Sequence, residues 1–174
     1  MRQPGERRGV PRSPLRCYLT RRRYAGAVTE VSCIFCQIVR GDAPSSQVYE
    51  DDDVLAFMDI RPFSTGHTLI IPKRHASGLG DLEPELGGKV FQVAQRIALG
   101  LRRSSLPVDG VNLMLADGRA AMQTVFHVHI HAVPRRHGDK LSIAKRVLMR
   151  RPTDLDEAAA LVREGLERLA AEEH

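Results

Sequence analysis

The stretch Val125-Phe126-His127-Val128-His129-Ile130-His131-Ala132-Val133 is the most informative part of this chain, because histidines alternate with apolar residues along it. Successive side chains of a β-strand point to opposite faces. A strand over residues 125–133, ended by Pro134, therefore places the three histidines on one face and the apolar residues on the other. Three imidazoles on one face of a central strand are costly to bury without partners, so the pattern indicates a functional site.

The chemistry of imidazole leaves three interpretations of this run open. Its unperturbed pKa near neutrality suits it to attack as a nucleophile, to transfer protons or to bind a metal. The run could therefore belong to an enzyme with a histidine nucleophile, or to a metal-dependent hydrolase with a His-x-His ligand pair. A solvated strand face of ordinary histidines is the third interpretation, and the apolar opposite face argues against it.

Outside this run, the spacing of apolar residues predicts an α+β domain. Strands are expected over residues 47–49, 54–58, 68–71 and 111–115, and a short helix over 34–39. A longer helix over residues 82–104, with Asp81 as its N-cap, is expected because apolar residues recur there at helical spacing. A second helix is expected over residues 154–170, with Thr153 as its candidate N-cap.

The length of 174 residues suits one ordinary domain with a real core. Residues 1–31 contain Pro4, Pro11 and Pro14 and few apolar residues, so we interpret them as a disordered, Arg-rich tail. Residues 32–174 are then a single domain with a C-terminal helix. A transit-like segment, or upstream sequence included through a wrong start codon, are the alternatives for the tail.

The charge distribution limits the classes of partner. The net charge is +5, but eight of the 26 basic and two of the 21 acidic residues lie in residues 1–31, so the remainder carries −1. Nucleic-acid binding needs basic charge on a folded face, so this partner is not expected. No stretch approaches the roughly 20 apolar residues that span a bilayer, so no membrane partner is expected. Three cysteines argue against a secreted disulfide framework and favour a cytoplasmic location.

Further segments accompany the histidine run in an order and spacing typical of a known family. They are Cys33-Ile34-Phe35-Cys36, Ala56-Phe57-Met58-Asp59-Ile60, Gly66-His67-Thr68-Leu69-Ile70-Ile71-Pro72-Lys73-Arg74-His75, Gly118, Gln123-Thr124 and Pro134-Arg135. Together with the run, they resemble the histidine triad (HIT) superfamily, and its Hint-like bacterial members in particular. The resemblance covers about residues 32–140.

This resemblance implies a fold and an activity. The HIT-type fold is an antiparallel sheet of about five strands with two main helices. The family forms homodimers with a continuous sheet, and residues 82–104 are expected at the two-fold interface. The implied activity is a nucleotide hydrolase or transferase, which cleaves at the α-phosphate of a purine nucleoside phosphoramidate or related AMP or GMP conjugate through a nucleotidyl-histidine. A dinucleoside polyphosphate hydrolase and a weakly active nucleotide-binding protein are the alternatives.

The resemblance also implies roles for individual residues. His129 would attack phosphorus and His131 would contact the phosphate oxygens, with Gln123 and Thr124 as further donors near the phosphate and leaving group. The Asp59 carboxylate would bind the ribose hydroxyls. An apolar slot for the base, which an ordinary core would also explain, would be lined by Ile34, Phe35, Ile38, Phe57 and Ile60.

The Cys33-x-x-Cys36 spacing suits structural zinc, redox chemistry or a pair of buried reduced thiols. The resemblance implies that His75 and His127 complete a Cys₂His₂ structural zinc site. It places His67 in a hydrogen-bond network beside this site. Two residues depart from the pattern of the family near the expected phosphate pocket, since Ala116 stands where Asn is common and Met122 where Gly is common.

Overall fold

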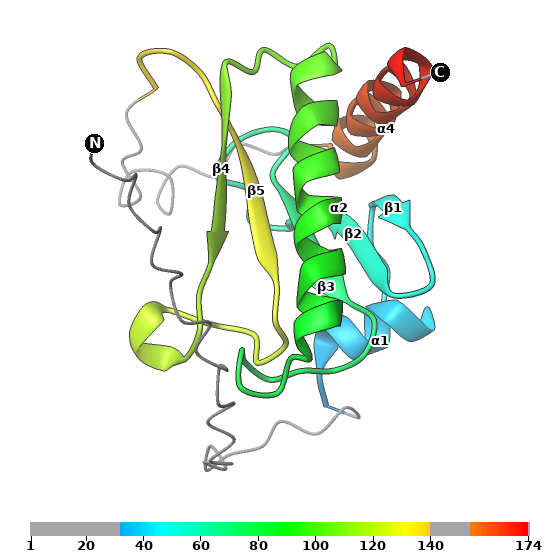
Figure 1. Cartoon of the computed structure of the whole chain (residues 1–174). Coiled ribbons are helices and arrows are strands. Elements are labelled where there is room, and N and C mark those ends of the chain that lie inside the picture. Colours follow the sequence, from blue (N-terminus) through cyan, green and yellow to red (C-terminus); the bar gives the residue numbers. More distant parts are fainter. Residues whose placement is uncertain (1–31, 140–153, 174) are drawn as a thin grey trace, which may run out of the picture.

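The computed structural model describes residues 32–139 and 154–173 (Figure 1). The expected disordered tail over residues 1–31 and the candidate cap Thr153 lie outside the described residues. The elements, in chain order, are α1 Ile34–Arg40, β1 Gln47–Glu50, β2 Val54–Met58, β3 Thr68–Pro72, α2 Pro84–Arg103, β4 Gly110–Leu115, the short 3₁₀ helix η1 Arg119–Ala121, β5 Ile130–Arg135 and α4 Leu155–Glu172.

The five strands form one antiparallel sheet in the order β1-β2-β3-β5-β4. The prediction of an α+β fold with five strands and two main helices is therefore confirmed. The observed bounds of β1 to β4 differ from the predicted ones by at most one residue at either end. Strand β5, which carries His131, lies between β3 and β4, so the site is built on the interior of the sheet.

The two faces of the sheet carry separate cores, because residues in β2 and β3 alternate between them. On one face, α2 and α4 cover the larger core, which includes Val54, Ala56, Met58, Ile70, Ile130 and Ala132 (Figure 1). On the other face, α1 covers a smaller cluster formed by Phe35, Ile38, Leu55, Phe57, Leu69 and Ile71. Every residue of β2 and β3 is buried as a result. The histidines lie on the α1 face.

The N-cap residues of both main helices differ from the predicted ones. Helix α2 begins at Pro84 with Glu83 as its N-cap, so Asp81 is not the cap. The ring of Pro84 fixes a helical φ and lacks the N–H that the first turn leaves unpaired, which favours proline at this position. Helix α4 is capped by Asp154, whose side chain accepts from the N–H groups of Asp156 and Glu157.

Strand β5 starts later and ends later than predicted. It begins at Ile130 rather than at Val125, because the pairing with β3 stops at the Ile70–Ile130 pair and β4 ends at Leu115, which also pairs with Ile130. Val128, just before this start, bonds to a loop instead, with its N–H donating to the Ala76 carbonyl. At its other end β5 continues to Arg135. Pro134 is tolerated there, because β3 pairs with β5 only as far as Ala132.

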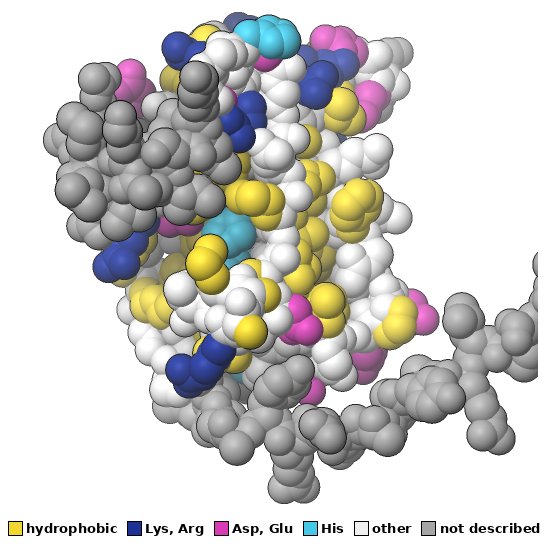
Figure 2. Space-filling model, turned by 90° about the vertical axis from the view of Figure 1, so that its left-hand side faces the viewer, with side chains coloured by type: hydrophobic (Ala, Val, Ile, Leu, Met, Phe, Trp, Pro, Cys, Tyr) yellow, Lys and Arg dark blue, Asp and Glu magenta, His cyan; other side chains and the backbone are white. Residues whose placement is uncertain are grey.

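The β4 edge of the sheet bears on the predicted homodimer. Within the described residues β4 pairs with β5 alone, so its other side is an open edge. Hydrophobic side chains gather on this face of the molecule (Figure 2), and Met114 and Leu115 of β4 are exposed. An open, partly apolar edge suits pairing with a second copy. The homodimer with a continuous sheet stays a prediction, which sedimentation of the full chain would test.

Candidate active site and metal centre

The three histidines form a row on the α1 face, although only His131 lies within β5. The ring of Phe35 from α1 contacts both His127 and His129 edge-on, at centroid distances of 5.9 and 5.3 Å. The rings of His129 and His131 are 4.9 Å apart. The prediction that the alternating pattern places all three imidazoles on one face is therefore confirmed by their contacts.

His129 is held in one tautomer by a backbone carbonyl. Its Nδ1–H donates to the carbonyl oxygen of His127 at 2.7 Å, so the Nε2 atom keeps a free lone pair in the neutral ring. Only 4% of the residue is exposed. Burial lowers the pKa of His129 below its usual value, against the opposing effect of the His127 carbonyl. A neutral imidazole with a bare Nε2 is the form that can act as a nucleophile.

His127 faces the two cysteines with its other nitrogen. Its Nε2–H donates to the Pro72 carbonyl at 2.8 Å, which leaves Nδ1 bare at 3.6 Å from Cys33 Sγ and 3.5 Å from Cys36 Sγ. His75 also presents Nδ1 to the Cys36 thiol, at 3.2 Å, while its Nε2 lies 3.2 Å from Ser77 Oγ. Burial lowers the pKa of His127 to about 4, so this ring is neutral at physiological pH.

These four residues fit a tetrahedral metal site. Cys33, Cys36, His75 and His127 present ligand atoms that all lie within 4.8 Å of one another. Zinc bonds of typical length place sulfur and nitrogen ligands about 3.5 Å apart in a tetrahedron, and the three sulfur–nitrogen distances given above are close to this value. Both histidines also have their second nitrogen next to an oxygen, which is the usual arrangement for a metal-bound imidazole. The cluster could therefore hold a metal ion.

Asp59 lies at the other end of the histidine row, just after β2. Its Oδ1 accepts from the Arg61 N–H at 2.7 Å, and its Oδ2 lies 3.6 Å from His67 Nδ1 and 3.9 Å from His131 Nδ1. These three side chains are close enough to share an ion. The facing nitrogens of the two histidines are 3.0 Å apart, however, and already form a hydrogen bond. His67 Nδ1 in turn accepts from the Phe63 N–H at 3.1 Å, so neither histidine nitrogen donates to Oδ2, which can accept from a ligand hydroxyl.

The side chain of Gln123, in the loop before the histidines, forms hydrogen bonds to three backbone groups. Its Oε1 accepts from the Gly118 N–H at 2.7 Å, and its Nε2 donates to the carbonyls of Ser77 and Val125 at 2.8 and 3.1 Å. Both amide hydrogens are used within the protein, so in this arrangement Gln123 fixes the loop rather than donating toward a leaving group. Thr124, next to it, is exposed.

Met122 adopts a backbone conformation that usually belongs to glycine. Its φ of 66° is the only positive value at a non-glycine position among the described residues. A side chain in this left-handed region is strained by about 1–2 kcal/mol. The side chain is 73% exposed, so nothing packs around it to offset the strain. The position therefore keeps the loop geometry expected of glycine despite its substitution.

The predicted apolar slot divides into two groups. Phe35, Ile38 and Phe57 are buried in the smaller core, where the two phenyl rings meet edge-on at 5.4 Å. Ile34 and Ile60 are exposed, at 43% and 78%. These two isoleucines, which precede Phe35 and follow Asp59 in the chain, are the part of the predicted slot that a ligand could still contact, whereas the other three act as core.

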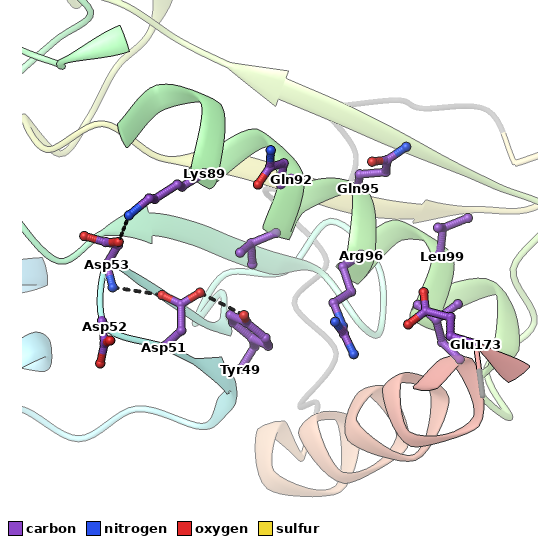
Figure 3. A pocket seen from close by; sticks show the side chains of 12 residues that line it. Tyr49, Asp51, Asp52, Asp53, Lys89, Gln92, Gln95, Arg96, Leu99 and Glu173 are labelled. Atoms are coloured by element: carbon purple, nitrogen blue, oxygen red, sulfur yellow. Dashed lines mark hydrogen bonds and ion pairs between the residues drawn. The ribbon is translucent and has the colours of Figure 1, made fainter. Parts of the chain in front are cut away.

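A separate surface groove of about 550 Å³ lies away from the histidines, between α2, α4 and the β1–β2 turn (Figure 3). Some of its polar side chains are bonded to one another. Lys89 pairs with Asp53, and the Tyr49 hydroxyl donates to Asp51 at 2.8 Å. The lining of this groove contains no histidine or cysteine, so it offers no nucleophile of the kind found in the histidine row. The histidine row is the better candidate site.

Comparison with known proteins places this geometry in a family. A family model of the HIT domain matches residues 40–138, more than half of the chain. The chain belongs to the HIT family. An uncharacterized HIT-like protein of Mycobacterium tuberculosis is 48% identical over 134 residues, which is 77% of this chain and 92% of that protein. The resemblance inferred from the histidine run and its companion segments is therefore confirmed.

Two further HIT relatives carry more specific descriptions. A crystal structure of a zinc-bound histidine triad family protein from Mycobacterium smegmatis is 49% identical, has a TM-score of 0.76, and aligns over 83% of this chain and 99% of its own. An adenosine 5′-monophosphoramidase of Saccharomyces cerevisiae is 36% identical over 120 residues, 68% of this chain and 73% of that protein. In the described part of the chain, no helix is long and apolar enough to cross a membrane.

Proposed function

We propose that this HIT protein is a nucleotide hydrolase that forms a covalent nucleotidyl intermediate on His129. The observation that carries the proposal is the hydrogen bond from His129 Nδ1–H to the His127 carbonyl, because it leaves a bare Nε2 on a neutral, buried ring. Attack on phosphorus needs a nucleophile held in one orientation, and His129 meets this requirement with a second imidazole beside it. The metal-dependent hydrolase is less well supported, since neither group of described residues that could hold a metal ion includes His129.

The reaction proceeds in two steps on this arrangement. His129 Nε2 attacks the α-phosphorus, a P–N(His) bond forms, and the bond to the leaving group breaks with its electron pair on that group. Water then attacks the same phosphorus, and His129 departs with its lone pair restored. The leaving group takes up one proton, and the water supplies it overall. His131 donates a hydrogen bond to the phosphate oxygens as their charge increases.

The substrate we propose is a purine nucleoside phosphoramidate, in which AMP or GMP is joined to an amine. The similarity to the yeast adenosine 5′-monophosphoramidase supports this class. Asp59 Oδ2 would accept from the ribose hydroxyls, and exposed Ile34 and Ile60 would contact the base. Thr124 would add a donor near the phosphate. A dinucleoside polyphosphate is the second candidate substrate. Ala116 and Met122 instead favour the weakly active nucleotide-binding protein, because they change the side chains beside the expected phosphate pocket.

The test is to incubate the full chain with adenosine 5′-phosphoramidate and with diadenosine polyphosphates, and to follow AMP release together with the intact mass of the protein. We expect AMP release from the phosphoramidate at the higher kcat/KM, and a transient mass increase equal to one adenylyl group. Faster cleavage of the diadenosine compound would make dinucleoside polyphosphates the preferred substrate class in place of phosphoramidates. AMP binding without turnover or adduct would leave a nucleotide-binding protein and refute the enzyme.

We also propose that the metal of the Cys₂His₂ cluster is structural zinc. All four ligand positions are filled by side chains, which leaves no open position for a substrate. The ion would tie α1 to His127 and thereby hold the carbonyl that orients His129. The zinc-bound relative from M. smegmatis supports the choice of metal.

Substitution of Cys33 by serine tests the zinc proposal. We expect about one zinc per chain in the wild type, and at least about a 100-fold loss of zinc affinity in Cys33→Ser with a lower melting temperature, because one ligand and the tie to α1 are lost. Cys17→Ser is the matched control and is expected to keep its zinc. Metal analysis and thermal melts provide both readouts. Equal zinc contents in the two variants would contradict the proposal.

A further inference from the structure

His67 is a buried histidine that the mechanism above does not use. It lies just before β3, in a tight turn closed by its own N–H donating to the Ser64 carbonyl, and none of its surface is exposed. Its ring stacks on Phe63 at a centroid distance of 5.2 Å. The polar side chains nearest to its ring are those of Asp59 and His131. A fully buried imidazole needs a partner for each nitrogen, so its hydrogen bonds define its state.

The two bonds of His67 determine where its proton lies. The backbone N–H of Phe63 donates to Nδ1 at 3.1 Å, so Nδ1 carries the lone pair and Nε2 carries the hydrogen. Nε2 lies 3.0 Å from Nδ1 of His131 and must donate to it. His131 Nδ1 is therefore an acceptor, and the hydrogen of the neutral His131 ring lies on Nε2.

We propose that His67 is a positioning residue that holds His131 in the Nε2–H tautomer, so that His131 presents a hydrogen-bond donor to the phosphate. This inference rests on the proposed function, and it explains how two neighbouring imidazoles serve opposite purposes. The His127 carbonyl makes His129 Nε2 an acceptor. The Phe63 amide, acting through His67, makes His131 Nε2 a donor. Two backbone groups of opposite polarity thus select the two tautomers.

The surroundings of His67 keep the arrangement neutral. Burial lowers the pKa of His67 to about 4, against the opposing charge of Asp59, and burial likewise lowers the pKa of His131 to about 4. Protonation of His67 would place hydrogens on both nitrogens and set Nδ1–H against the Phe63 N–H. The Phe63 amide and the low pKa therefore favour the same state of the ring.

Nuclear magnetic resonance of the full chain labelled with ¹⁵N-histidine tests the tautomers without any substrate. We expect His131 to show a protonated Nε2 and an unprotonated Nδ1 in the wild type. The reverse assignment, or a rapidly exchanging mixture, would overturn the proposal even if the enzyme is active. Inactivity toward nucleotides combined with the expected tautomer would refute the proposed function and leave this inference intact, so the two failures are distinguishable.

Substitutions of His67 separate positioning from simple packing. In His67→Gln, the amide oxygen can accept from Phe63 and the amide nitrogen can donate to His131, whereas His67→Leu fills a similar volume without a donor. We expect the glutamine variant to keep the Nε2–H tautomer and most of kcat. The leucine variant should lose the tautomer and roughly 10–100-fold in kcat with little change in KM, as for loss of one transition-state donor. Equal kcat in two folded variants would overturn the proposal.

Discussion

Replacement of His129 by alanine is expected to lower kcat/KM for phosphoramidate hydrolysis by at least about 10⁴-fold, because it removes the nucleophile itself. The fold should persist, since His129 makes a single hydrogen bond to the neighbouring His127 carbonyl. The variant should also show no increase in mass upon incubation with substrate, whereas nucleotide binding through Asp59 should remain. Steady-state rates, intact mass and AMP binding measure these three effects separately.

The matched control for this variant is His137→Ala, which removes an exposed histidine close to the end of β5. We expect its kcat/KM to stay within a factor of about two of the wild-type value, because surface substitutions away from a site have small effects. Residual hydrolysis at a tenth of the wild-type rate in His129→Ala, with an adduct still present, would assign the nucleophile to another residue.

The pH dependence of the wild type provides an independent check on the same nucleophile. Burial lowers the pKa of His129, so its free base persists below the ordinary histidine pKa of about 6.5. kcat/KM should therefore be nearly constant from pH 8 to about 6.5, and fall only as the pH drops further and Nε2 is protonated. A rate that already halves near pH 7 would contradict a buried, neutral nucleophile.

Substitution of Gly165 by alanine is expected to lower the free energy of unfolding by about 3 kcal/mol or more. Gly165 lies where α4 crosses α2, and a Cβ added there would be 2.1 Å from the Gly100 carbonyl oxygen and 2.9 Å from the Ser104 nitrogen. Both are backbone atoms, one in α2 and one in its C-cap residue, and they cannot rotate away as a side chain would. The helices would have to separate, and the larger core between them and the sheet would loosen.

Gly88→Ala provides the matched control, because Gly88 also lies in a helix but has nothing within 4 Å of an added Cβ. Alanine favours helix over glycine by about 1 kcal/mol, so this variant should be slightly stabilised. Urea unfolding of both variants gives the two free energies. A neutral or stabilising effect of Gly165→Ala would show that α4 does not pack closely on α2, and would also question the helix pair as the cover of this sheet face.

Local patterns in the sequence predicted most secondary structure, because each depends on a few neighbouring residues. Period-two and buried apolar runs fixed β1 to β4 within a residue of their ends, and the helical spacing found α2 and α4. The errors arose where a distant or competing group mattered. Helix α2 begins at Pro84 rather than after Asp81, and β5 begins only at Ile130, where its pairing with both β3 and β4 starts.

The functional residues show the same difference between what local sequence patterns predict and what distant groups decide. The alternating histidines predicted a functional site, whereas the proposed roles of His129 and of the four residues of the metal cluster came from the resemblance to the HIT superfamily. The side-chain amide of Gln123, by contrast, was expected near the phosphate, and the structure uses both of its hydrogens on the carbonyls of Ser77 and Val125. A residue type specifies which hydrogen bonds are available, but the fold decides which of them are already taken.

The sequence by itself determined the family, the order of the elements and the face on which the imidazoles lie, because these follow from residue identity and spacing. Tertiary structure alone brought Cys33 to His127, 94 residues away, and set the tautomers of His129 and His131. Those tautomers depend on the His127 carbonyl and the Phe63 amide. Every residue except proline carries both backbone groups, so no letter of the sequence marks the two that are aimed at an imidazole.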